Sequence, residues 1–177
     1  MGTSTGLALY TDVHFCETPP HDVRKARKAC IREGLAFEAE VQIWLDKQLG
    51  FRHHRNRWIR YKDEEGTIRH AQPDSFLESS TDIWIYEMKL RHTPNSARQL
   101  ALYGELLAEL FPGKAIHLIE CYKYWDWVIY PSPIVELGMT SWQTDLQGKI
   151  GLLHYSDTWR ISHQTPDTTH LEKCNEH

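Results

Sequence analysis

The chain has 177 residues, a length typical of one domain. Hydrophobic residues make up 41% and charged residues 25%, which excludes a wholly disordered chain, and no apolar run approaches the roughly 20 residues of a membrane span. The net charge is −4, and the four cysteines are scattered without a CxxC pair. We therefore expect a cytoplasmic (intracellular) protein with reduced thiols, no membrane partner and no structural zinc.

The charges are distributed unevenly along the chain. Residues 22–62 hold 11 Lys/Arg and 5 Asp/Glu, a balance of 11 − 5 = +6. Residues 120–177 hold 4 Lys/Arg and 8 Asp/Glu, a balance of 4 − 8 = −4. A basic N-terminal half indicates a surface that meets a polyanion, although an ordinary solvated surface is an equal alternative.

The first predicted element is a helix within residues 22–50. Residues 1–21 show little periodicity and are predicted to be a loosely ordered lead-in. Asp22 can cap the start of the helix and Gly50 can follow its end. The apolar residues between them recur at helical spacing: Phe37, Val41, Trp44, Leu45 and Leu49.

Strands follow, and a second helix lies among them. The pattern predicts a hairpin of residues 58–61 and 67–70, then strands at 75–77 and 82–90. It predicts a helix that begins after Pro94 and stops at Pro112-Gly113, a buried parallel strand at 115–119, and a last strand at 149–155. Residues 164–177 are predicted to be a polar tail. We therefore expect one α/β domain over residues 22–163.

The strand at 82–90 carries two ionisable residues on a face that should be buried. Alternate side chains of a strand share a face, so Ile83, Ile85, Glu87 and Lys89 point the same way. If the strand at 75–77 pairs with this strand, Asp74 lies beside Glu87. Two facing carboxylates repel each other unless a cation lies between them, and hard oxygen ligands suit Mg²⁺ or Mn²⁺. Lys89 is then placed to orient an attacking water or stabilise charge on a phosphate.

The same residues resemble a known signature. Pro73-Asp74 followed by Glu87-Met88-Lys89 resembles the PD-(D/E)XK motif of Mg²⁺-dependent nucleases in the restriction-endonuclease-like superfamily. Gly34-Leu35-Ala36-Phe37-Glu38 looks like the Gly-x-x-x-Glu of the preceding helix in that superfamily. Gln99-Leu100-Ala101-Leu102-Tyr103 resembles the Gln-x-x-x-Tyr helix of RecB-like members. The resemblance covers about residues 32–119.

The resemblance implies a fold and a set of site residues. The fold would be an αβββαβ core with a mixed central sheet flanked by helices. Mg²⁺, for which Mn²⁺ can substitute, would be held by Asp74, Glu87, the Met88 carbonyl and Glu38, with Lys89 as a further catalytic residue. Gln99 and Tyr103 would touch substrate, although a core tyrosine and a surface glutamine are equally expected.

Each proposed ligand has an alternative in the sequence. Glu40 is a rival to Glu38 because it neighbours Phe37 and Trp44 on the same helix. Asp82 is a weaker rival to Asp74, since it falls in the predicted turn. Some RecB-like relatives carry a C-terminal cysteine cluster, whereas this chain has only Cys174 there, so no iron–sulfur cluster is expected.

The basic stretch before the first hairpin is the candidate phosphate contact. Arg52, Arg55 and Arg57 lie within six residues, and a solvated surface is again the equal alternative. Together these patterns predict Mg²⁺-dependent hydrolysis of DNA, by an exonuclease or an endonuclease. The alternatives are a junction-resolving endonuclease that acts as a homodimer, and a non-catalytic nucleic-acid-binding or assembly module of a larger DNA-processing complex.

Overall fold

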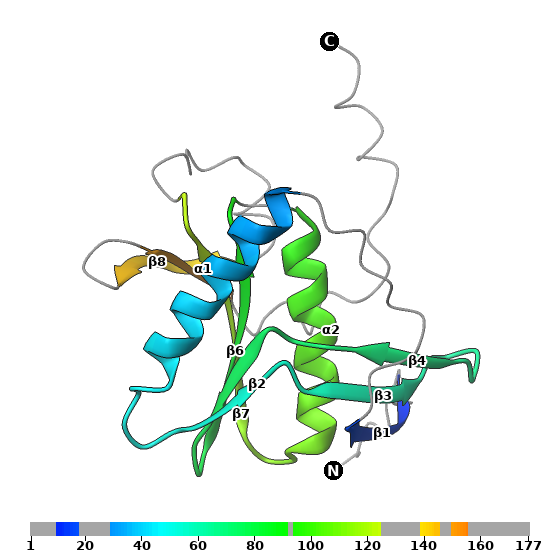
Figure 1. Cartoon of the computed structure of the whole chain (residues 1–177). Helices are drawn as coiled ribbons and strands as arrows, with labels where there is room; N and C mark the ends of the chain where they lie inside the picture. Colours follow the sequence, from blue (N-terminus) through cyan, green and yellow to red (C-terminus); the bar gives the residue numbers. More distant parts are fainter. Residues whose placement is uncertain (1–9, 18–28, 92–93, 125–138, 146–149, 156–177) are drawn as a thin grey trace.

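The computed structural model of the chain describes residues 10–17, 29–91, 94–124, 139–145 and 150–155 (Figure 1). These residues form a mixed α/β structure, and none of the helices among them is long and apolar enough to cross a membrane. The elements are, in chain order, β1 (Thr11–Cys16), α1 (Ala29–Leu45), β2 (Arg52–Arg55), β3 (Trp58–Lys62), β4 (Ile68–Ala71), β5 (Ser75–Glu78), β6 (Asp82–Lys89), α2 (Pro94–Leu110), β7 (Ala115–Tyr122), β8 (Met139–Asp145) and β9 (Ile150–Tyr155).

The larger sheet has six strands in the order β2-β5-β6-β7-β9-β8. β6 and β7 pair in parallel, and all other neighbours in this sheet are antiparallel. The parallel pair is possible because α2 returns the chain to the start of the neighbouring strand. The predicted buried parallel strand after this helix is thus confirmed.

The two helices cover opposite faces of this sheet, and in Figure 1 β6 runs between them. On one face, α1 packs Phe37 and Val41 with Tyr86 and Met88 of β6. On the other face, α2 packs its own apolar residues with Ile83 and Ile85 of β6. The alternation of β6 therefore sends Glu87 and Lys89 to the face that α2 covers.

A smaller sheet of order β1-β3-β4 packs on the α2 side. Its strand β1 lies in the segment predicted as a loosely ordered lead-in. The ring of Phe15 in β1 stacks on Phe76 of the larger sheet at 6.1 Å between ring centroids and also meets Phe111. This long-range packing explains why a segment with little local periodicity forms a strand.

Helix α1 ends earlier than predicted, at Leu45 instead of near Gly50. The backbone N–H groups of Lys47 and Gln48 bond three residues back, to Trp44 and Leu45, which closes the last turns tightly. Leu49 lies beyond the helix and is 93% exposed, so its place in the predicted apolar stripe was wrong. Strands β2 and β8 were not predicted. The predicted cap Asp22 and the tail 164–177 lie outside the described residues.

Candidate functional site

Asp74 directly precedes β5 and lies beside the C-terminal part of β6. Ser75 pairs with Tyr86 in the antiparallel register, so Asp74 lies opposite Glu87. The Asp74 Oδ2 atom accepts the backbone N–H of Met88 at 2.8 Å. The backbone N–H of Asn56 donates to the Asp74 carbonyl at 3.1 Å. These bonds hold the Asp74 carboxylate against the strand that carries Glu87.

Glu87 is a buried carboxyl group with an incomplete set of partners. It is 1% exposed. Burial raises its pKa to about 7, the Asp74 carboxylate adds to the rise, and the Lys89 ammonium offsets part of it. Among the residues that the structure describes, no hydrogen-bond donor reaches its Oε2 atom. A buried carboxylate opposite a second carboxylate is a position that a cation would stabilise.

Lys89 extends its ammonium group to the Glu87 carboxylate, and the two form an ion pair. Burial by itself lowers the pKa of Lys89, but the charge and hydrogen bond of Glu87, together with the charges of Asp74 and Glu120, raise it above its ordinary value. Lys89 therefore remains a cation at neutral pH. We refer to Asp74, Glu87 and Lys89 as the carboxylate–lysine site.

A second buried glutamate lies next to this site, and the sequence analysis missed it. Glu120 of β7 is opposite Glu87 in the parallel register and is fully buried. Its Oε2 atom accepts a hydrogen bond from the Tyr155 hydroxyl at 2.7 Å. The Glu120 carboxylate also contributes to the raised pKa of Glu87. The available signal was its place in an apolar strand, on the same face as Leu118 and Tyr122.

Glu38 reaches the site through Gln42, another residue that the sequence analysis missed. Gln42 Nε2 donates to Glu38 Oε1 at 3.0 Å and to the Asp74 carbonyl at 3.3 Å. Asn56 Nδ2 donates to the same Glu38 oxygen at 3.1 Å. Glu40, by contrast, is exposed on α1. The structure thus places Glu38, and not its rival, beside the segment that carries Asp74.

Helix α2 brings Gln99 and Tyr103 to the same region. Tyr103 is 6% exposed. Burial raises the pKa of Tyr103, and the negative charges of the Glu87 and Asp74 carboxylates raise it further. A hydrogen bond from Gln99 acts in the opposite direction and links the two α2 side chains. The sequence pair therefore lies next to the carboxylate–lysine site.

The alternative ligand Asp82 lies at the opposite end of β6. It accepts a hydrogen bond from His117 Nε2 at 2.8 Å. It is five residues from Glu87 along the strand, which corresponds to about 17 Å at the rise of a β-strand. The structure does not bring Asp82 to the carboxylate–lysine site.

The three arginines of the basic stretch are exposed but differ in position. Arg55 forms an ion pair with Asp46, and the Arg57 guanidinium stands 5.1 Å from the ring centroid of Phe15. Arg52 lies opposite Glu78, which in turn lies opposite Ile83, at the far end of β6 from Glu87. Arg52 and Arg55 thus lie at opposite ends of the edge strand β2, with Arg55 opposite Ser75, and Arg57 lies beyond this strand.

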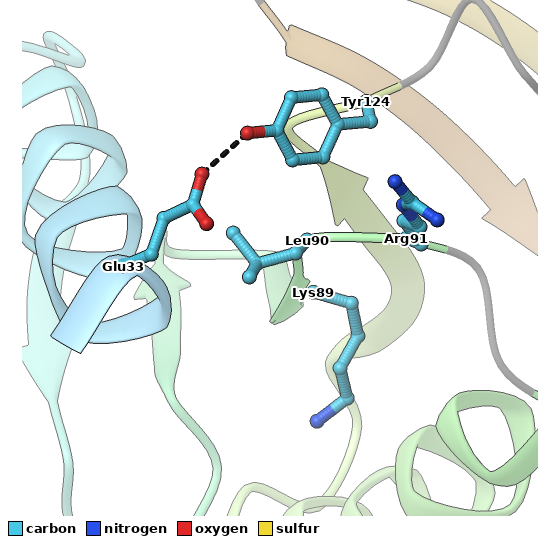
Figure 2. A pocket seen from close by; sticks show the side chains of 5 residues that line it. All are labelled: Glu33, Lys89, Leu90, Arg91 and Tyr124. Atoms are coloured by element: carbon cyan, nitrogen blue, oxygen red, sulfur yellow. Dashed lines mark hydrogen bonds between the residues drawn. The ribbon is translucent and has the colours of Figure 1, made fainter. Parts of the chain in front are cut away.

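A pocket of about 470 Å³ opens beside Lys89, where β6 and β7 end next to α1 (Figure 2). It is lined by Glu33, Lys89, Leu90, Arg91 and Tyr124, and we call it the Tyr124 pocket. Figure 2 shows Tyr124 joined to Glu33 across one side of the pocket, with Arg91 next to the tyrosine ring. Lys89 thus contributes to both the pocket and the carboxylate–lysine site.

The arrangement can bind a divalent cation through two carboxylates and a backbone carbonyl, but it is a sparse donor set. Within the described ranges, no three His, Cys, Asp or Glu side chains are grouped so that they could hold a metal together. Comparison of the chain with protein-family models, with curated proteins and with solved structures finds no match.

Proposed function

We propose that the chain is a Mg²⁺-dependent nuclease with a restriction-endonuclease-like core, which hydrolyses phosphodiester bonds of DNA. The observation that carries this proposal is the position of Glu87: a buried carboxylate, opposite Asp74 and in contact with Lys89. In a purely structural role, such a group would be costly, because a buried charge needs partners that balance it. A site that binds a cation and a phosphate supplies those partners.

The residues present fit a divalent cation. The Glu87 Oε2 atom has no hydrogen-bond donor in the described part of the chain, and the negative charge of Asp74 raises the pKa of Glu87. Asp74, Glu87 and the Met88 carbonyl would hold Mg²⁺, with Glu38 supporting the segment of Asp74 through Gln42. When bound, the ion supplies a Lewis acid and lowers the pKa of a coordinated water.

The protein side chains orient the reactants. The Lys89 ammonium, held by Glu87, offers N–H donors to an attacking water and to a phosphate oxygen. The hydrogen bond from Met88 fixes the Asp74 carboxylate before substrate arrives, so little reorganisation is needed. Gln99 and Tyr103 lie on the α2 side of the site and would contact the substrate strand there, although Tyr103 is also part of the hydrophobic core.

The test is incubation of the purified full chain with linear, circular, single-stranded and branched DNA, each with Mg²⁺, Mn²⁺ or EDTA. We expect cleavage with either metal and none with EDTA. Asp74→Asn should abolish it, whereas Glu40→Gln, a neutralised carboxylate on the exposed face of α1, should cleave like wild type. DNA binding without cleavage under every condition would favour the non-catalytic module, and cleavage by Asp74→Asn at the wild-type rate would overturn the proposed site.

A further inference from the structure

The Tyr124 pocket adjoins the proposed reaction centre through one shared residue. The stem of Lys89 lines the pocket, and its ammonium contacts Glu87. Figure 2 shows this ammonium at the opposite end of the pocket from Tyr124. The volume of about 470 Å³ lies in the range of about 300–1,000 Å³ that is usual for small-ligand sites. Whatever fills this pocket therefore lies next to Lys89.

The charges around the pocket favour an anionic ligand. The negative charge of Glu33 is balanced locally, because its carboxylate accepts hydrogen bonds from the Lys123 ammonium at 2.7 Å and from the Tyr124 hydroxyl. These two donors also lower the pKa of Glu33. Arg91 is exposed and adds a positive charge at the rim, 5.6 Å from the Tyr124 ring centroid. An arginine at this position can bind a phosphate through two N–H donors.

The pocket also offers flat surfaces to an aromatic ligand. The hydrogen bond to Glu33 holds the Tyr124 ring in one orientation. The guanidinium of Arg91 stands over this ring and is a second planar group, and Leu90 adds an apolar wall. Nucleic-acid bases stack on tyrosine rings and on arginine planes. An aromatic ligand that carries a phosphate matches both the surfaces and the charge.

We propose that the Tyr124 pocket binds one unpaired nucleotide of a DNA strand, next to the phosphate that is cleaved, with its base against Tyr124 and its phosphate toward Arg91. The position of the cleaved bond rests on the proposed nuclease function, whereas binding by the pocket does not. A base inside a duplex is stacked and paired, so it reaches a concave pocket only after leaving the stack. The pocket thus selects single strands and frayed ends over intact duplex.

The experiment measures DNA binding by Glu87→Gln protein in EDTA, so that no cleavage interferes. Fluorescence anisotropy compares a labelled short oligothymidylate with a blunt duplex of equal length. We expect tighter binding of the single strand. Adding Tyr124→Leu to the Glu87→Gln protein should raise the Kd for the single strand at least about fivefold, which is the lower end of the effect of base stacking. Adding Arg91→Gln should raise this Kd and reduce the salt slope by about 0.7.

Two matched variants make the result specific. Tyr124→Phe keeps the ring and removes only the hydroxyl, so it should bind nearly like the parent. Lys47→Gln removes a positive charge from an exposed position just beyond the other end of α1 and should have no effect. A melting curve of each variant checks that it folds, and Arg91→Gln, at an exposed residue, tests the pocket even if Tyr124→Leu unfolds.

The outcomes separate this inference from the proposed function. If wild type cleaves DNA with Mg²⁺ but Tyr124→Leu and Arg91→Gln bind the single strand as tightly as the parent, the pocket assignment is overturned and the proposed nuclease function stands. If binding depends on both residues but wild type never cleaves, the pocket stands and the nuclease is overturned. If Tyr124→Phe and Tyr124→Leu lose the same amount of affinity for the single strand, the effect belongs to the hydrogen bond with Glu33 and not to base stacking. If the parent protein binds the duplex as tightly as the single strand, the pocket does not select single strands. Either result overturns the inference.

Discussion

The carboxylate of Asp74 accepts the backbone N–H of Met88 at 2.8 Å, which ties the residue before β5 to the residue between Glu87 and Lys89. A single hydrogen bond thus sets the position of one proposed metal ligand relative to the two other functional side chains. It uses one carboxylate oxygen of Asp74 and a donor that every non-proline residue has at this position.

This bond predicts different effects for two substitutions of Asp74. Asp74→Asn keeps an oxygen that can accept from Met88 and removes the charge opposite Glu87, so its melting temperature in metal-free buffer should equal or exceed that of wild type. Asp74→Ala leaves a backbone N–H inside the structure without its acceptor, at a cost of about 1–3 kcal/mol. Thermal unfolding of both variants checks the difference, and equal melting temperatures would contradict the structural role of the bond.

Glu87 predicts a dependence of stability on pH in the absence of metal. Its folded-state pKa of about 7 lies above the value of 4.5 expected in the unfolded chain. A raised pKa contributes stability that is fully present below about pH 4.5 and is lost as the pH rises through 7. The loss is of the order of 3 kcal/mol, at 1.36 kcal/mol per unit of pKa.

The comparison uses Glu87→Gln, which has a similar size and cannot ionise. In EDTA, the melting temperature of this variant minus that of wild type should increase as the pH rises from 4.5 to 8. Groups shared by the two proteins cancel in the difference. A difference that stays constant over this range would contradict the buried, raised-pKa carboxyl group.

Glu38 and Glu40 provide a matched pair on one helix. Glu38 accepts hydrogen bonds from Gln42 and Asn56 near Asp74, whereas Glu40 is exposed. Glu38→Gln should therefore lower the cleavage rate about tenfold or more, which is the usual cost of removing a group that orients metal ligands. Glu40→Gln should leave it unchanged. Single-turnover rates of the two variants decide, and a larger loss in Glu40→Gln would reverse the choice.

Replacing Arg52, Arg55 and Arg57 together by Ala should weaken binding to all DNA sequences alike. Each lost phosphate contact should reduce the slope of log affinity against log salt by about 0.9 on duplex DNA. Arg69→Ala is the control, since Arg69 pairs with Asp63 on the β3–β4 hairpin. A salt slope that does not change in the triple variant would mean that these arginines are plain solvated surface.

Lys89→Met separates catalysis from metal binding, because Lys89 donates no ligand atom in this account. The affinity of the Lys89→Met variant for Ca²⁺, measured by calorimetry, should stay near that of wild type. Its single-turnover cleavage rate should fall by about 10²–10³, the typical loss of one preorganised group that stabilises developing charge. Lys47→Met, at an exposed position, serves as the control. An unchanged rate would show that the match to the Glu-x-Lys motif is coincidental.

Local patterns predicted much of the site because its central residues lie on adjacent elements. The turn between residues 75–77 and 82–90 implied the pairing that brings Asp74 to Glu87, and the two-residue period placed Glu87 on the buried face. Glu120 was not predicted as part of the site because its position opposite Glu87 depends on the register of two parallel strands that are separated by a helix. Neither hydrophobic periodicity nor turn residues encode that register.

Two of the missed strands, β1 and β2, have a related cause. β1 and β2 are edge strands whose partners, β3 and β5, lie elsewhere in the sequence. A basic strand such as β2 has no apolar alternation, and its sequence predicted only a phosphate contact. The predicted end of α1 was too late because Leu49 has helical spacing, although Leu49 is 93% exposed.

The central claim is that Asp74 and Glu87 hold the metal that DNA hydrolysis needs. The most direct measurement is the single-turnover cleavage rate of a labelled DNA strand against Mg²⁺ concentration, for wild type and for Glu87→Gln. The account predicts a rate that saturates with Mg²⁺ in wild type and no Mg²⁺-dependent cleavage in the variant. Saturation at the same Mg²⁺ concentration and the same rate in both proteins would contradict it.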